Sequence, residues 1–266
     1  MARLLLFLGF CMLAGLGPVR SQVLTSIPAS TVDDAKSFWG AVMEEFYGPY
    51  SKRSKCWIGK AGAERLCMRP HLLSSVMVGG EVTQFAAMSG HAIQPDGSHA
   101  ECHGCAGKLG LVVLRAAGNR LALVARNSLS EDIGSWGMAP PEEAFRVVRL
   151  GKDNYGWLIE SGFTGQGYTQ GGVSVFGVLG DKVVDLGFID TYSDNEGTCG
   201  DGLGTCYRHS YEIVSDADSG SARFADLVAR KLESSDPDAT ASFTIPFSND
   251  ELKYLPPEAL SAQLGG

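Results

Sequence analysis

Long apolar runs are scarce in this chain. No stretch reaches the about 18 continuous apolar residues that a membrane-spanning helix needs, and the first, residues 4–16 (LLLFLGFCMLAGL), has only 13. It follows the basic residue Arg3, as the h-region of a signal peptide does. Val19 and Ser21 place small or modest side chains at the −3 and −1 positions. We therefore predict that residues 1–21 are a signal peptide, and that the cleaved chain inserts stably in no membrane.

Cys11 lies within this apolar run, so a lipoprotein signal is the alternative. A lipidated cysteine is preceded by a small residue, whereas Phe10 precedes Cys11, which also comes early in the run. We therefore favour cleavage after Ser21 and a periplasmic or extracellular destination.

Basic residues are outnumbered by acidic ones. The chain has 22 lysines and arginines against 30 aspartates and glutamates, a net charge of −8. Removal of the signal peptide takes away Arg3 and Arg20 and no acidic residue, which leaves 20 basic and 30 acidic residues and a net charge of −10. Nucleic-acid binding needs cationic surface to displace counterions, and anionic lipid attracts basic segments. The charge therefore argues against both kinds of partner.

Helical patterns are also few. Ser30 resembles an N-cap, apolar residues then recur at helical spacing, and Gly48 ends the pattern. This predicts one amphipathic helix near residues 31–46, within an N-terminal helical arm of residues 22–52.

Short apolar runs separated by turn residues dominate the remainder, residues 53–266. They predict successive β-hairpins from the pairs 72–78 and 81–88, 109–115 and 121–126, 145–150 and 155–160, 173–179 and 182–188, and 207–214 and 224–231, with a last strand at 242–247. The alternation of strands and helices typical of a parallel sheet is missing. We predict a mainly β, single-domain antiparallel meander of hairpins, a sandwich or an open barrel-like fold, with a C-terminal tail.

Six cysteines remain after the signal peptide, and they fall into three local couples. An even number in an exported chain indicates disulfides. The simplest pairing joins the members of each couple, Cys56 with Cys67, Cys102 with Cys105, and Cys199 with Cys206.

The stretch HAECHGCAGK (99–108) sets two histidines beside a Cys-x-x-Cys pair. Haem attachment requires a histidine directly after the second cysteine, where this chain has Ala106. With His91, the residues His99 and His103 could hold Zn or Cu, although oxidation of the cysteines would leave only imidazoles as ligands. The preferred hypothesis is a loop-closing disulfide with histidines facing solvent and no cofactor.

The glycine-rich stretch SGFTGQGYTQGG (161–172) precedes a β-rich run and not a helix, so it does not predict a phosphate-binding loop. We expect a wide turn or bulge there. Gln166 and Tyr168 in this loop are the candidate residues for contact with a glycan or peptide.

The sequence contains no Walker loop, no G-x-G-x-x-G, no G-x-S-x-G and no H-E-x-x-H motif. These absences favour an exported, non-catalytic binding protein for an unknown protein or cell-envelope partner. A metal-binding protein or metalloenzyme centred on residues 91–105 is the alternative. An exported hydrolase without a recognisable motif is the third hypothesis.

Overall fold

The computed structural model describes residues 23–99, 101–200, 204–217 and 222–265, so the predicted signal peptide lies outside the described residues. The strands are β1 Val23–Pro28, β2 Tyr50–Ser51, β3 Cys56–Ala61, β4 Glu64–Val78, β5 Glu81–Ile93, β6 Gly107–Ala117, β7 Arg120–Arg126, β8 Glu131–Ile133, β9 Phe145–Gly151, β10 Asn154–Gly165, β11 Tyr168–Leu179, β12 Lys182–Asp194, β13 Arg208–Ser215, β14 Leu227–Ser234, β15 Ser242–Ile245, β16 Phe247–Ser248 and β17 Lys253–Tyr254. The helices are α1 Ala35–Tyr47 and α2 Glu258–Leu264, with single 3-10 turns η1 Ala29–Asp33 and η2 Glu142–Ala144.

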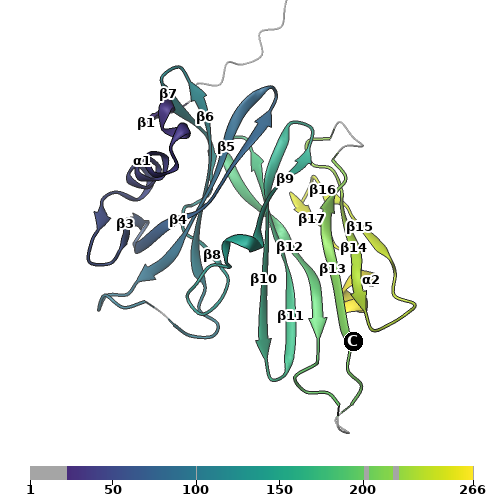
Figure 1. Cartoon of the computed structure of the whole chain (residues 1–266). Helices are drawn as coiled ribbons and strands as arrows, with labels where there is room; N and C mark the ends of the chain where they lie inside the picture. Colours follow the sequence, from purple (N-terminus) through teal and green to yellow (C-terminus); the bar gives the residue numbers. More distant parts are fainter. Residues whose placement is uncertain (1–22, 100, 201–203, 218–221, 266) are drawn as a thin grey trace, which may run out of the picture.

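The strands form one large, open and mostly antiparallel sheet, which confirms the predicted fold class (Figure 1). Strands β1 to β8 make its N-terminal half and strands β9 to β15 make its C-terminal half. The two halves meet where β7 and β12 share a single parallel residue pair, Arg126 with Lys182. The sheet does not close on itself, because its order runs from β2 at one end to β15 at the other.

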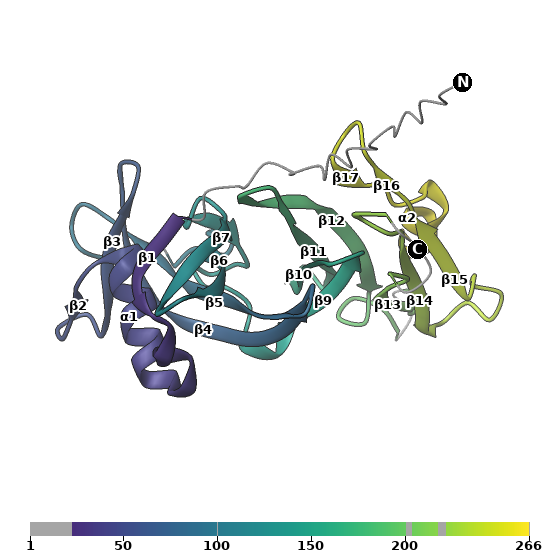
Figure 2. The same ribbon diagram turned by 90° about the horizontal axis from the view of Figure 1, so that it is seen from above.

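Alternating side chains in each half build separate cores on the two faces of the sheet. In β6, Leu111 and Val113 face the C-terminal half, whereas Val112 and Leu114 face α1. Trp157 of β10 packs against Phe85 of β5 at 5.2 Å between ring centroids, so the two halves share a central core. Figure 2 shows α1 beside the N-terminal half and α2, β16 and β17 beyond the C-terminal half.

The N-terminal helix is present but begins later than predicted. Asp34, and not Ser30, is its N-cap, because the Asp34 carboxylate accepts the Ser37 backbone N–H at 2.7 Å. Its buried residues, Phe38, Val42 and Met43 among them, pack on β4 to β6, so the predicted arm is part of the N-terminal core. A second helix, α2, was not predicted; the residue before it is Pro257, which offers no side-chain cap.

The predicted hairpins are all present, and most of their strands are longer than expected. The glycine-rich stretch contains no wide turn, but it does contain an irregularity of the kind predicted, because the β11–β12 register shifts between Gly171 and Gly172. Strands β10 and β11 continue through it in register, with Gly165 opposite Tyr168, and only Gln166 and Gly167 form the turn. Both turn residues have positive φ, 55° and 84°, as a two-residue hairpin turn requires.

The predicted disulfides are confirmed: the structure joins Cys56 to Cys67, Cys102 to Cys105, and Cys199 to Cys206. Three disulfides are typical of proteins from an oxidising, extracytoplasmic compartment. Within the part of the chain that the structure describes, no helix has the length and apolarity needed to cross a membrane.

Candidate functional site

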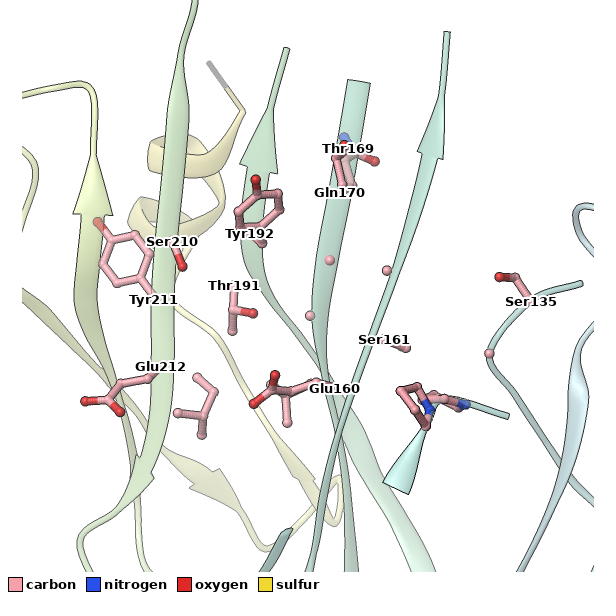
Figure 3. A pocket seen from close by; sticks show the side chains of 18 of the residues that line it. Ser135, Glu160, Ser161, Thr169, Gln170, Thr191, Tyr192, Ser210, Tyr211 and Glu212 are labelled. Carbon is pink, nitrogen blue, oxygen red and sulfur yellow. The ribbon is translucent and has the colours of Figure 1, made fainter. Parts of the chain in front are cut away.

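A groove of about 610 Å³ runs between the β8–β9 connection and strands β10 to β14 (Figure 3). Its volume falls within the roughly 300–1,000 Å³ typical of ligand sites. The connection supplies Ser135, Trp136 and Met138, and the strands supply glycines, hydroxyl groups, Gln170 and Leu232. In Figure 3, Ser135 lies on the connection, across the groove from Glu160 and Ser161 on β10.

One wall of the groove is a tight turn that carries an exposed tryptophan. The Met138 N–H donates to the Ser135 carbonyl at 3.0 Å, and the two central residues, Trp136 and Gly137, have φ of 56° and 70°. This is the backbone of a type I′ turn, whose first central position usually holds Asn, Asp or Gly. A bulky residue with positive φ is an outlier, and such strain persists where surrounding structure enforces it, often at binding sites.

The Cys102–Cys105 disulfide loop enforces this turn. The Gly137 N–H donates to the Cys105 carbonyl at 2.8 Å, which ties the turn to the loop. Behind it, the backbone of Met138 and Ala139 lies directly on Gly107, where any side chain would clash. The disulfide, although it closes a very short loop, therefore positions one wall of the groove.

The ring of His103, inside this disulfide loop, contacts both the β8–β9 connection and strand β10. Its ring lies 4.4 Å from the Trp136 ring and 4.4 Å from the Phe163 ring of β10, measured between centroids. We call His103, Trp136 and Phe163 the aromatic cluster. Through His103, Trp136 is linked to Phe163 on the sheet, while about half of the surface of Trp136 stays exposed.

Glycines keep the floor of the groove open. Gly162, Gly171 and Gly172 line it without projecting side chains. A Cβ at Gly172 would clash with the Ile189 carbonyl oxygen and with the ring of Phe188. Phe188 therefore rests directly on the backbone at Gly172, at the edge of the floor.

The charged side chains along the groove are acidic. Glu160 pairs with Arg146 and Glu212 with Arg230, each at 3.3 Å, and neither arginine lines the groove. Tyr192 is fixed as a neutral hydrogen-bond donor to Asp194 at 2.6 Å, and this hydrogen bond raises the pKa of the phenol. Among the described residues, no lysine or arginine lines the groove.

The three histidines predicted as metal ligands are divided between two places. His91 and His99 stack at 4.4 Å between ring centroids, and His99 Nε2 lies 2.7 Å from the Glu101 carboxylate. His103 belongs to the aromatic cluster instead, and both cysteines of the motif are oxidised. In the described ranges, no three His, Cys, Asp or Glu side chains are grouped so that they could hold a metal ion.

Two serine–histidine contacts bear on the hydrolase hypothesis. Ser89 Oγ lies 2.9 Å from His71 Nδ1, and Ser234 Oγ lies 2.7 Å from His209 Nδ1. In a Ser-His-Asp site the serine contacts Nε2, and Nδ1 donates to the orienting carboxylate. Both contacts use the nitrogen that the carboxylate needs, so neither has the geometry of a triad.

The candidate loop residues and the groove residues differ. Tyr168 is half exposed at the start of β11, and Gln166 occupies the neighbouring turn, but neither lines the groove. Sequence reasoning missed Trp136, Met138 and Leu232. The glycines that flank Ser135-Trp136 predict a turn there, and an aromatic residue within it was the only available signal.

Comparison of the chain with protein-family models, with curated proteins and with solved structures yields no match. A functional conclusion therefore depends on the groove itself.

Proposed function

We propose that this chain is an exported, non-catalytic binding protein that holds a partly apolar peptide segment of a partner protein in the groove. The observation that carries the proposal is the gathering of exposed apolar side chains there: Trp136, Met138 and Leu232 are 51%, 65% and 63% exposed. Tryptophan and methionine are enriched in protein interfaces, and buried tryptophans are frequent hot spots. Groups of exposed apolar side chains often mark interaction sites.

The polar groups of the groove favour a peptide over a hydrocarbon chain. Ser135, Ser161, Thr169, Gln170 and Ser210 line it beside the apolar residues. An acyl chain would take these groups out of water without giving them hydrogen-bond partners, which costs free energy. A peptide backbone offers N–H donors and C=O acceptors that satisfy them.

The strained turn at Trp136 supports a binding role. A left-handed conformation costs a non-glycine residue roughly 1–2 kcal/mol, and Asn or Gly at this position would relieve that cost. The disulfide loop and the aromatic cluster hold the tryptophan in this position before any ligand arrives. Such preorganisation lowers the entropy cost of binding.

Export by the predicted signal peptide, to the periplasm or the cell exterior, would bring the groove to partners outside the cytoplasm. The three disulfides agree with such a compartment.

Selection from a random heptapeptide display library against the immobilised, oxidised full-length mature chain tests the proposal. We expect enriched peptides rich in apolar residues, whose binding to the Met138→Ala variant is weaker by about 1–2 kcal/mol. Met77→Ala is the matched control, because Met77 is 57% exposed on β4 and lies outside the groove.

Two results would overturn the proposal. One is that no peptide is enriched whose binding responds to Met138→Ala. The other is that lauroyl lysophosphatidylcholine binds in the groove whereas no peptide does, which would make the protein a lipid carrier.

A further inference from the structure

We propose that the pocket beside the groove binds a lysine or arginine side chain of the same peptide segment. This inference rests on the proposed function and specifies the chemistry of the partner. The pocket has a volume of about 340 Å³ and is lined by His103, Phe163, Phe188 and Asp190 among other residues.

The pocket and the groove are continuous. They share Ser135, Ser161, Gln170 and the glycines 134, 162 and 171 as lining residues. A peptide in the groove can therefore place one side chain in the pocket while its neighbours contact Trp136 and Met138.

Two phenylalanine rings offer their surface to a ligand in this pocket. Phe163 and Phe188 are 47% and 49% exposed, so each leaves part of its ring surface open to a ligand. Phe163 is backed by the ring of His103, and Phe188 rests on the backbone at Gly172. Aromatic faces held in place in this way attract a cation through the ring quadrupole, and arginine is the more frequent partner.

Asp190 provides the opposite charge. Its carboxylate is exposed, and it has no ion-pair partner among the described residues, whereas Glu160 and Glu212 in the groove each have an arginine. No lysine or arginine lines the pocket in the part of the chain that the structure describes. A neutral side chain packed there would desolvate the Asp190 carboxylate without replacing its hydration, and an anionic one would be repelled.

An arginine satisfies the two features together. Its planar guanidinium can lie on an aromatic face while its N–H groups donate to a carboxylate, and its aliphatic stem can follow the apolar wall. Gln170, which also lines the pocket, provides a further acceptor.

The test uses one arginine-containing peptide selected on the full-length chain and a matched peptide in which citrulline, a neutral isostere, replaces that arginine. We expect the wild-type protein to bind the arginine peptide about tenfold more tightly, and this ratio to fall to about two- to threefold in Asp190→Asn, where only the aromatic faces still favour the cation. Phe188→Leu should also reduce the ratio, because it removes an aromatic face.

Asp153→Asn is the matched control. Asp153 is an exposed aspartate in the β9–β10 turn with φ of 51°, which asparagine tolerates, and it lines neither cavity. This variant should keep the full ratio. Thermal unfolding of each variant verifies that it is folded before its affinity is compared.

The outcomes separate the two proposals. Selected peptides without basic residues, equal binding of the arginine and citrulline peptides, or a ratio left unchanged by Asp190→Asn would each overturn the inference and leave the proposed function standing. Failure to select any peptide that depends on Met138 would overturn the proposed function itself.

Discussion

The ring centroids of Trp136 and His103 lie 4.4 Å apart. Trp136 belongs to the connection between the two halves of the sheet, and His103 belongs to a disulfide loop. The contact holds an exposed tryptophan in a left-handed backbone conformation at the edge of a groove. The Gly137–Cys105 hydrogen bond links the same two segments through the backbone. The site therefore depends on contacts between loops.

Replacement of Trp136 by asparagine should weaken peptide binding without lowering the stability of the fold. Asparagine accepts positive φ readily, so the free energy of unfolding should stay equal or rise by up to about 1 kcal/mol, the gain being limited by loss of the His103 contact. The same change should weaken binding of a selected peptide by about 2 kcal/mol or more, because it removes the aromatic anchor. Urea unfolding and calorimetric titration measure the two effects. A large loss of stability with unchanged affinity would show that Trp136 is a structural residue.

Removal of the Cys102–Cys105 disulfide by paired serine substitution should affect the groove more than the fold. The bridge closes a loop with a sequence separation of 3, so we expect a stability loss well below the ~3 kcal/mol of a 15-residue loop. Without the bridge, the loop that carries His103 and accepts the Gly137 N–H would no longer be fixed. We therefore expect the affinity for a selected peptide to decrease.

The Cys199–Cys206 pair is the control for this experiment, since its sequence separation is also short, 7 residues, and it lines neither cavity. Its paired serine variant should keep full peptide affinity. Equal affinities of both variants and the wild type would show that the first disulfide does not position the site.

Thiol titration of the unfolded, unreduced mature chain should find no free thiol.

A side chain at Gly172 should distort the groove floor. Gly172→Val would clash with the Ile189 carbonyl and displace Phe188, so both stability and binding should decrease, stability by about 1–3 kcal/mol. Gly40→Ala in α1 is the contrasting variant, because no atom outside the adjoining backbone of α1 lies within 4 Å of the added methyl group. It should raise stability by about 0.5–1 kcal/mol without changing peptide affinity. Unchanged binding by Gly172→Val would contradict the assigned floor.

His71 and His91 should make the fold sensitive to mild acid. Burial holds the pKa of both imidazoles below the usual histidine value of 6.5, and the neighbouring His99 and Arg69 lower that of His91 further. Below this pH the unfolded chain binds protons that the folded histidines still exclude. The free energy of unfolding should therefore be constant above about pH 7 and fall as the pH drops below about 6.5.

Urea unfolding as a function of pH measures this dependence. The double variant His71→Gln, His91→Gln should show a smaller decrease over the same interval, because the depressed groups are gone. An equally steep decrease in that variant would assign the acid sensitivity to carboxylates.

Local sequence signals were sufficient for most of the sheet. Short apolar runs such as 111–114, and the turn residues between strands, predicted the hairpins and the fold class. The short spacings predicted the disulfide pairing. The width of the glycine-rich turn was overestimated because glycines carry no strand pattern, and because β11 is held by pairing with β12, which is not visible locally.

The groove was not predictable in the same way. Trp136 occupies a backbone position that propensity would give to asparagine or glycine, so no turn rule points to it. His103 lies close to His99 in the sequence, which suggested a shared metal site, but the disulfide loop directs its ring to Trp136 and Phe163. Leu232 joins the groove from a distant strand, through tertiary structure alone.

The most direct test of the binding groove compares two methionines. Calorimetric titration of the selected peptide into Met138→Ala and Met77→Ala measures the loss of affinity on removing an exposed methionine side chain inside and outside the groove. The proposed function predicts affinity weakened about five- to thirtyfold for Met138→Ala and wild-type affinity for Met77→Ala. Equal affinities for the two variants would contradict the assignment of the groove as the binding site.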